Sequence, residues 1–317
     1  MTAPHRTPAW PPPRPLARWQ TWLVVMIILV VPFFVPISPV LRRNVLISAL
    51  GDRLHIVLTA GITLLLYWKG PLRGRLLGAA VAAAVAGAAI EGLQLFVGRT
   101  ALFHDWLLDL MGIGMVVGWV LFRGHGRRSG LALAGGLVTL AAAQLWYVPV
   151  VMMAAREAQE RFPVIEDFEG RLAGKLWNGT YDAEIEVTPD AAASGRAGLR
   201  LVAGPPGLWP GAAMRRFPHD WSGYQALELQ VRHTTAGLDS VRFGIRLDDF
   251  ETQHDKGYLS RGFWVKNTWR TVRIDFAGRR TLVTDRPFDA TDVDLIAVFL
   301  RTPADSVTFE IDDVRLR

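Results

Sequence analysis

Residues 76–98 read LLGAAVAAAVAGAAIEGLQLFVG, a run of 23 residues in which the one charged side chain is that of Glu91. A helix needs about 20 apolar residues to cross the hydrocarbon core of a bilayer. Four other runs approach this length, and they lie at 21–40, 54–68, 105–122 and 131–153. The sequence therefore predicts an all-α transmembrane bundle of about five spans over residues 21–155, preceded by a tail at 1–20.

The first of these runs is also compatible with a signal peptide. It is longer than the usual apolar core of such a peptide, contains Pro32 and Pro36, and lacks a cleavage site of the Ala-x-Ala kind. We therefore interpret 21–40 as a span that is retained.

Charged residues divide the chain near Ala155. Up to that point there are 13 Lys or Arg and 4 Asp or Glu, a net charge of +9, and after it there are 22 and 25, a net charge of −3. Short basic clusters between apolar runs are typical of membrane topology signals, so no nucleic-acid partner is expected. The absence of cysteine excludes disulfides, zinc–thiolate sites and thiol catalysis.

The basic residues of the loops predict the orientation, because cytoplasmic loops retain Lys and Arg. The tail and every second loop contain nine of them: Arg6, Arg14, Arg18, Lys69, Arg73, Arg75, Arg123, Arg127 and Arg128. The alternate loops contain four: Arg42, Arg43, Arg53 and Arg99. The N-terminus is therefore predicted to be cytoplasmic, and five spans then place everything after Met153 on the outer face.

Three of the four acidic residues in the membrane half lie within or at the edge of predicted spans, where an unpaired charge costs at least about 2.5–3.5 kcal/mol. Residues three or four apart share a helix face, as Glu91 does with Gln94 and Asp105 with Asp109. We predict a polar cluster, neutralised mainly by Arg99, that consists of Asp52, His55, Glu91, Gln94, Arg99, Asp105 and Asp109. The alternative is a set of interhelical hydrogen bonds that only pack the helices.

These residues resemble the signature of the VanZ-like membrane family. Glu91-Gly-Leu-Gln94, Gly98-Arg99, Asp105, Asp109 and Gly112 are similar to its E-x-x-Q, G-R, D-x-x-x-N-x-x-G pattern, and Asp52-Arg53-Leu54-His55 resembles its D-K-x-x-H opening. Asp109 stands where the family usually has Asn, and the spacing from Asp52 to His55 is one residue short. The resemblance covers about residues 20–125 and implies a bacterial membrane protein from a family named for glycopeptide resistance. It supplies no biochemical activity.

Short alternating segments separated by turn residues replace the apolar runs after Phe162, which predicts β-strands. We expect strands at 183–188, 198–202, 226–232, 240–247, 270–276, 294–300 and 307–316. Their length and spacing favour an all-β sandwich of the jelly-roll kind over residues 160–317. The protein is thus predicted to have two domains of different fold class.

This second half resembles the galactose-binding-like jelly rolls, especially carbohydrate-binding modules close to family 11. The resemblance rests on the segments at 165–170, 220–224, 267–274 and 310–316, which read IEDFEG, DWSGY, NTWRTVRI and EIDDVRL. It implies recognition of a glycan without hydrolysis, with Trp221 and Trp269 as structural tryptophans.

Glycan binding lays sugar faces on exposed aromatic rings and satisfies hydroxyls with polar side chains. The candidates are Trp209, Asp248, Asp249, Phe250, Tyr258 and Trp264, accompanied by Gln253 and Arg261. The alternative for the aromatic residues is core or loop packing. Acidic residues near both ends of this half could meet on adjacent strands and hold a structural calcium ion, or form a solvated edge: Asp167, Glu169, Asp312 and Asp313.

Catalytic motifs such as G-x-S-x-G, H-E-x-x-H and a phosphate-binding glycine loop are absent from the sequence, which favours a protein that is not an enzyme. Our first hypothesis is a multi-pass protein of the bacterial cytoplasmic membrane that presents a glycan-binding domain on its outer face. Its partners would be the lipid bilayer and an envelope glycan or polysaccharide, with no cofactor required. The second hypothesis is a transporter, or an enzyme acting on a lipid-linked sugar, in which the intramembrane polar cluster is the working part.

Overall fold

The computed structural model describes residues 25, 27–29, 31, 41, 43–51, 53–94, 103–125, 128–181, 183–205, 208–301 and 303–317. The chain forms two compact units. The first comprises Met1–Ile37 and Gly51–Gln144, and the second comprises Ser38–Leu50 and Leu145–Arg317. The predicted span at 21–40 falls mostly outside the described residues.

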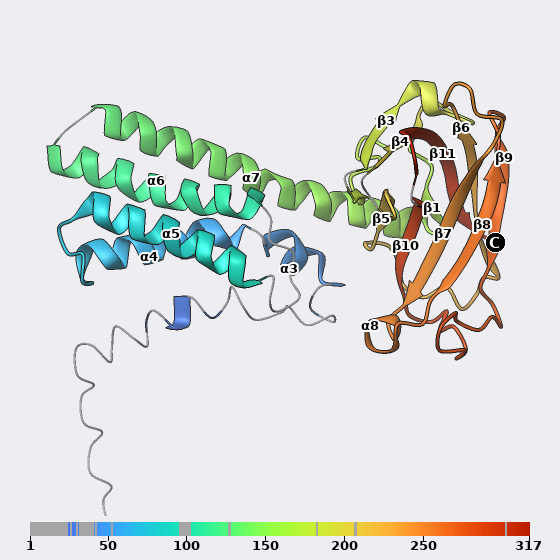
Figure 1. Ribbon diagram of the computed structural model, residues 1–317, viewed down its shortest axis with the longest axis horizontal. Coiled ribbons are helices and arrows are strands. Elements are labelled where there is room, and N and C mark those ends of the chain that lie inside the picture. Colours follow the sequence, from blue (N-terminus) through green and yellow to red (C-terminus); the bar gives the residue numbers. More distant parts are fainter. Residues whose placement is uncertain are drawn as a thin grey trace, which may run out of the picture. The chain divides into compact units, whose positions relative to one another are not determined.

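The first unit is built from helices. Its members are α4 (Leu54–Trp68), α5 (Leu76–Gln94), α6 (Phe103–His125) and the first part of α7 (Arg128–Arg161), as Figure 1 shows. Buried residues of α4 recur every three or four positions at His55, Ile56, Thr59, Ile62 and Thr63, so one face of this helix packs inward. α6 contacts both α4 and α5.

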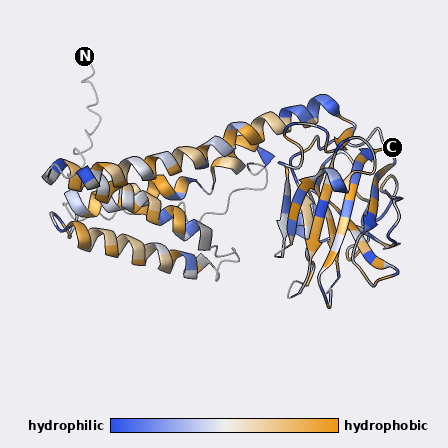
Figure 2. Ribbon diagram, turned by 90° about the horizontal axis from the view of Figure 1, so that it is seen from above, coloured by the Kyte–Doolittle hydropathy of each residue, from blue (hydrophilic) through white to orange (hydrophobic). Residues whose placement is uncertain are grey.

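The outward surfaces of these helices are strongly apolar, as their colouring in Figure 2 shows. Leu77 is 78% exposed and Val85 is 63% exposed, although both are aliphatic. Among the described residues, three helices are long and apolar enough to cross a membrane, at Leu76–Leu93, Asp105–Arg123 and Gly130–Arg161, and α4 is a shorter apolar helix. The helices predicted at 54–68, 105–122 and 131–153 are thus present, and the one predicted at 76–98 is present as far as Gln94, after which its residues lie outside the described part of the chain.

The second unit contains an antiparallel β-sandwich of two sheets. Sheet A has the strand order β3 (Glu184–Thr188), β4 (Gly198–Ala203), β11 (Val307–Leu316), β6 (Ala226–His233) and β9 (Arg270–Asp275), with β1 (Val164–Glu166) also pairing with β11. Sheet B has the order β2 (Trp177–Thr180), β5 (Gly211–Met214), β10 (Val293–Leu300), β7 (Val241–Asp249) and β8 (Leu259–Val265). The chain alternates repeatedly between the sheets, which confirms the predicted sandwich.

The two sheets enclose one hydrophobic core. Alternate residues of each strand point into it, as the pleat requires, and the rings of Phe243 on β7 and Phe309 on β11 meet with centroids 5.1 Å apart. Trp221 is fully buried there, as expected, whereas Trp269 is half-buried beneath the guanidinium of Arg232 and is not a core residue.

Two helical segments also belong to this second unit. Val151, Ala154 and Ala155, near the end of α7, join the core cluster of the sandwich. The short helix α3 (Val45–Leu50) adds Ser48, whose hydroxyl accepts hydrogen bonds from Arg216. The second unit therefore combines a segment before α4 with the long segment after Gln144.

Candidate functional site

The outward face of sheet B carries a row of residues that crosses all five strands. Its register aligns Thr180 of β2, Gly211 of β5, Phe299 of β10, Gly244 of β7 and Gly262 of β8. A Cβ atom on Gly244 would lie 2.5 Å from Cζ of Phe299, so the glycine leaves the space that the ring occupies. Three glycines thus make a flat surface around one aromatic ring.

Two tryptophans extend this aromatic surface. Trp209 packs edge-on against Phe299 with ring centroids 5.3 Å apart, and it is 41% exposed. Trp264 of β8 pairs in register with Arg242 and is 63% exposed. Large exposed rings on one face of a sheet are suited to stacking against the apolar face of a sugar.

A cavity of about 440 Å³ adjoins the same face at its β2–β5 edge. Outward residues of these strands line it, including Asn178 and Ala213, which pair in register. Three arginines, two polar side chains and one carboxylate complete most of the lining: Arg43, Arg215, Arg216, Ser48, Gln253 and Asp294. The cavity is therefore polar and rich in hydrogen-bond donors.

Asp248 lies on the outward face as the partner of Arg246. The guanidinium donates to both carboxylate oxygens at 2.6 and 3.0 Å, and it also lies 4.1 Å from the ring centre of Tyr258. Burial raises the pKa of Asp248, and the bonds from Arg246 offset this only in part. Asp248, Arg246 and Tyr258 form a compact polar group beside the aromatic surface.

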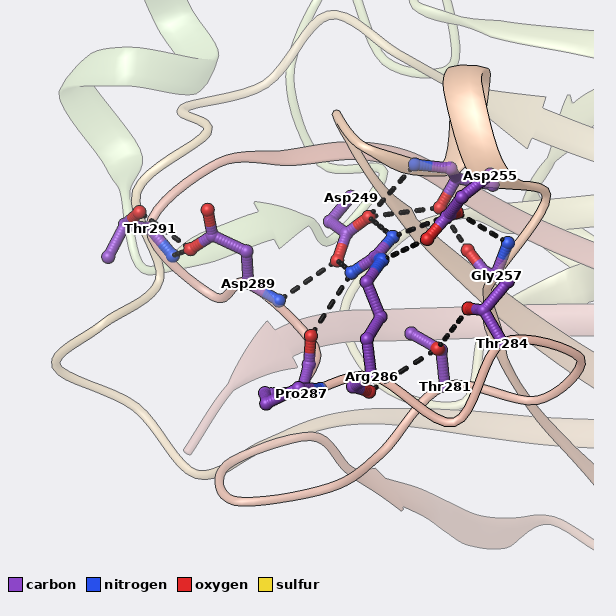
Figure 3. Close-up of polar contacts among 10 residues, drawn as sticks. Asp249, Asp255, Gly257, Thr281, Thr284, Arg286, Pro287, Asp289 and Thr291 are labelled. Carbon is purple, nitrogen blue, oxygen red and sulfur yellow. Dashed lines mark hydrogen bonds and ion pairs between the residues drawn. The ribbon is translucent and has the colours of Figure 1, made fainter.

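Asp249 has a different role, which Figure 3 shows. Its carboxylate accepts hydrogen bonds from the guanidinium of Arg286 and from the amide nitrogens of Thr252 and Asp289. Burial favours the neutral form, but these donors outweigh it and hold the pKa of Asp249 below its usual value. Arg286 also pairs with Asp255, so this network ties loops of the sandwich together.

Phe250 is likewise engaged within the protein. The guanidinium of Arg43 lies 4.3 Å from its ring centre, and His254 packs against its edge. Gln253 donates to Asp294 at 3.2 Å in the cavity, whereas Arg261 is directed to the sandwich edge, where it donates to the carbonyl of Arg273. Of the six predicted glycan-binding residues, the structure brings Trp209, Asp248, Tyr258 and Trp264 to the outward face of sheet B.

Sequence reasoning missed several residues of this face, most of all Phe299 and the arginines. Phe299 lies in a continuous apolar strand, where nothing in the local pattern separates it from the core residues beside it. Arg43 precedes α4 in the sequence and lies more than 100 residues before the first strand, so its position on the sandwich has no local signal. The glycines beside Phe299 are brought there by strand register, which no signal along the chain reveals.

The four carboxylates considered for calcium have partners in the protein. Asp312 accepts from the amide nitrogens of Ala193 and Ser194, and burial raises its pKa despite these bonds. Glu169 accepts from Arg196 and Ala197, while Asp167 pairs with Arg161 and Asp313 with Arg315. Backbone amides and guanidiniums therefore occupy oxygens that an ion would need.

The helical unit brings four members of the predicted polar cluster together. His55 on α4, Glu91 on α5 and Asp105 on α6 are buried, and one potential ligand atom from each lies within 4.8 Å of the others. His55 Nδ1 is 3.1 Å from Oδ1 of the fully buried Asp109. Asp52, Arg99 and the side chain of Gln94 lie outside the described part of the chain.

Glycine makes the approach of these helices possible. A Cβ on Gly87 of α5 would lie 2.6 Å from Oδ2 of Asp109, and a Cβ on Gly112 of α6 would lie 2.6 Å from Oγ1 of Thr59 on α4. Thr59 also donates to the backbone carbonyl of Asp109 at 3.2 Å. Small residues at helix contacts are typical of packing within a bilayer.

Comparison with known proteins finds similarity among solved structures alone. No family model matches the chain, and no curated protein matches its sequence. Among solved structures it is similar to the family 11 carbohydrate-binding module of a cellulosomal cellulase of Clostridium thermocellum, with 19% identity over 48% of this chain and 92% of that one and a TM-score of 0.37. It is also similar to the family 11 module from the same organism in complex with a β-1,3-1,4-mixed-linked tetrasaccharide. Here the identity is 18% over 48% of this chain and 93% of that one, with a TM-score of 0.38.

A xylan-binding domain from Paenibacillus barcinonensis is also similar, with 15% identity over 48% of this chain and 90% of that one and a TM-score of 0.35. These likenesses extend over about half of the chain. The VanZ-like resemblance of the helical part has no matching family model and stays a prediction.

Proposed function

We propose that the β-sandwich is a non-catalytic glycan-binding module whose binding surface is the outward face of sheet B. The observation that carries this proposal is the aromatic surface of the exposed Trp209 and Trp264 and the half-buried Phe299 on one face of one sheet. The neighbouring polar groups, Asp248 with Arg246 and Asn178 in the cavity, are suited to sugar hydroxyls.

The carboxylates of this face support binding without hydrolysis. A glycosidase needs two carboxyl groups that act as acid and as base or nucleophile on the same bond. Asp248 accepts hydrogen bonds from Nε and Nη2 of Arg246, and Asp294 forms ion pairs with Arg43 and Arg215. Carboxylates fixed by guanidiniums are suited to orienting a ligand.

The test is glycan binding by the full-length protein in detergent or nanodiscs. Trp264→Ala and Phe299→Ala should each weaken binding at least tenfold, equivalent to about 1.4 kcal/mol, because each removes a stacking surface. Trp269→Ala is the matched control, since this tryptophan lies beside sheet A under Arg232. Absence of binding across a broad panel of neutral and charged glycans contradicts the proposal.

We further propose that the helical unit spans the bacterial cytoplasmic membrane, with the sandwich on the outer face as part of the cell envelope. Three apolar helices of sufficient length, their exposed aliphatic side chains and the bias of basic residues between loops support this. A link to wall or polysaccharide handling, or to glycopeptide resistance, belongs to the same proposal.

The buried His55–Glu91–Asp105 group favours a second candidate function, transport or chemistry on a lipid-linked sugar. Ionisable groups buried among apolar helices are costly and often serve a pathway or reaction. Glu91→Gln preserves shape and removes the charge, so a working cluster predicts loss of the cellular phenotype at normal protein levels. A wild-type phenotype for this variant, together with loss on deleting residues 162–317, would assign the cluster a structural role.

A further inference from the structure

The charge on the outward face of sheet B is opposite to that of the domain as a whole. Residues after Ala155 include 22 basic and 25 acidic side chains, a net charge of −3. The described part of this face and its cavity draws five arginines from those residues, namely Arg215, Arg216, Arg242, Arg246 and Arg301, against the carboxylates of Asp248 and Asp294. Five positive and two negative charges leave +3 on this surface.

Arg43, which lines the cavity, also pairs with Asp292, and the two charges cancel one another in this count. Arg43 pairs with both Asp292 and Asp294. The positive excess is therefore unchanged when the segment before α3 is included.

Several of these cations have no counter-ion among the described residues. Arg216 donates to the hydroxyl of Ser48 at 3.1 and 2.9 Å and has no carboxylate within ion-pair distance in that part of the chain. Arg242 and Arg301 likewise have no acidic partner among the residues that the structure describes. The guanidinium of Arg301 lies 5.7 Å from the ring centre of Trp209. Nη2 of Arg43 is buried without a hydrogen-bond partner in the described structure.

One of these arginines lies close to the aromatic surface, over a glycine of β8. A Cβ on Gly262 would lie 2.9 Å from Nε of Arg242, so this guanidinium extends across β8 next to Trp264. Cationic side chains and stacking surfaces thus occupy the same face. This combination fits a ligand with both sugar rings and negative charges, because guanidinium groups bind carboxylates in strong charge-assisted hydrogen bonds.

We propose that the ligand of this face is an acidic glycan whose uronate carboxylates bind the arginines of the cavity while its rings stack on the aromatic surface. This inference rests on the proposed glycan-binding function and names its substrate class. Arg216 and Nη2 of Arg43 are the donors assigned to a carboxylate in the cavity. Phe299 and Trp264 contact the sugar ring.

The experiment measures binding of full-length protein to a panel of uronate oligosaccharides, namely galacturonate, glucuronate and mannuronate–guluronate chains. Each is compared with its methyl ester, which keeps the sugar backbone and removes the charge, and with a neutral β-glucan of equal length. We expect at least one uronate series to bind at least tenfold more tightly than its ester. This preference should shrink as salt rises from 20 to 500 mM, because screening weakens charge pairing.

Variants separate charge recognition from ring stacking. Arg216→Gln should reduce affinity for the preferred uronate at least tenfold and leave binding of its ester unchanged. Arg156→Gln is the matched control, since this exposed arginine of α7 forms a pair with Glu160 away from the sheet. Trp264→Ala should weaken both ligands equally, and thermal melting of each variant shows whether it is folded.

The possible outcomes distinguish the two proposals. Binding of neutral glycans or esters as tight as that of every uronate overturns the acidic ligand and retains the glycan-binding function. Absence of all glycan binding overturns both. Equal binding of anionic lipid vesicles and inorganic phosphate, with no uronate bound, assigns the arginines to phosphate and likewise overturns the inference.

Discussion

Asp248 and Asp249 follow one another at the end of β7, and their carboxylates meet different surroundings. Successive side chains of a strand point to opposite faces. Asp248 therefore faces outward beside Arg246, where burial raises its pKa, whereas Asp249 turns to Arg286, whose hydrogen bonds help to lower its pKa. Two adjacent residues that look equivalent in the sequence thus belong to the outward face of sheet B and to a loop network.

Asp249→Asn should destabilise the sandwich by about 2–3 kcal/mol. Breaking a buried ion pair costs about 3–5 kcal/mol, and Arg286 retains Asp255 and some solvent contact, which reduces the cost. The measurement is the thermal unfolding of the full-length protein at pH 7. Asp285→Asn is the control, because this carboxylate is exposed in the same loop region and pairs only at the surface.

The same pair predicts a pH dependence. The pKa of Asp249 is lowered in the folded state, so its contribution is complete above the unfolded value of about 3.9 and is lost as pH falls through the folded value. The difference in stability between wild type and Asp249→Asn should therefore be constant from pH 7 to 5 and decrease below pH 4. A difference that grows with acidity would contradict the assignment.

The strands that alternation predicted and the strands that it missed differ in composition. β6, with Leu227, Leu229 and Val231 on one face, follows the expected pattern and was predicted. β5 reads GAAM, β2 reads WNGT and β8 contains Gly262, and none of these has the β-branched alternation that marks a strand. Pairing with long neighbours such as β10 and β7 holds these weak segments in sheet B.

At the level of helices, α4 and α6 approach so closely that their contact needs a glycine. Gly112→Ala should lower the melting temperature of the detergent-solubilised protein, because its methyl group would meet the carbonyl of Ile56 and the hydroxyl of Thr59. Gly135→Ala is the matched control, since a Cβ at that position of α7 has no described atom within 4 Å. Equal melting temperatures for wild type and Gly112→Ala would contradict this prediction, because they would show that α4 and α6 can move apart without loss of stability.

The whole molecule combines a unit with an apolar exterior and a unit with an enclosed core. Apolar side chains such as Leu77 and Val85 are exposed on the helices, whereas those of the sandwich face inward between two sheets. A bilayer is the solvent that suits the first unit, and water suits the second. The change in composition near Ala155 coincides with this change from an apolar exterior to an enclosed core.

The orientation of the whole chain is tested with reporters fused after Arg317. A reporter that is active only outside the cytoplasm should be active there, and one that is active only in the cytoplasm should be inactive. The physical reason is the excess of basic residues in the tail and alternate loops, nine against four, which retains those loops in the cytoplasm. The opposite pattern of activities would reverse the topology.

The sequence by itself determined the helices at 54–68 and 105–122, seven of the strands and the division into two fold classes, because apolar run length and alternation are local properties of the chain. It also indicated Trp209 and Trp264 as candidate ring surfaces, because both are large aromatic residues in the strand-rich half. Only the tertiary structure decided that Phe299 lies outward between Gly211 and Gly244, and that Arg43 reaches Asp294 across 251 positions of sequence. Strand pairing and the docking of α3 create these contacts, and residues that meet in this way carry no common signal along the chain.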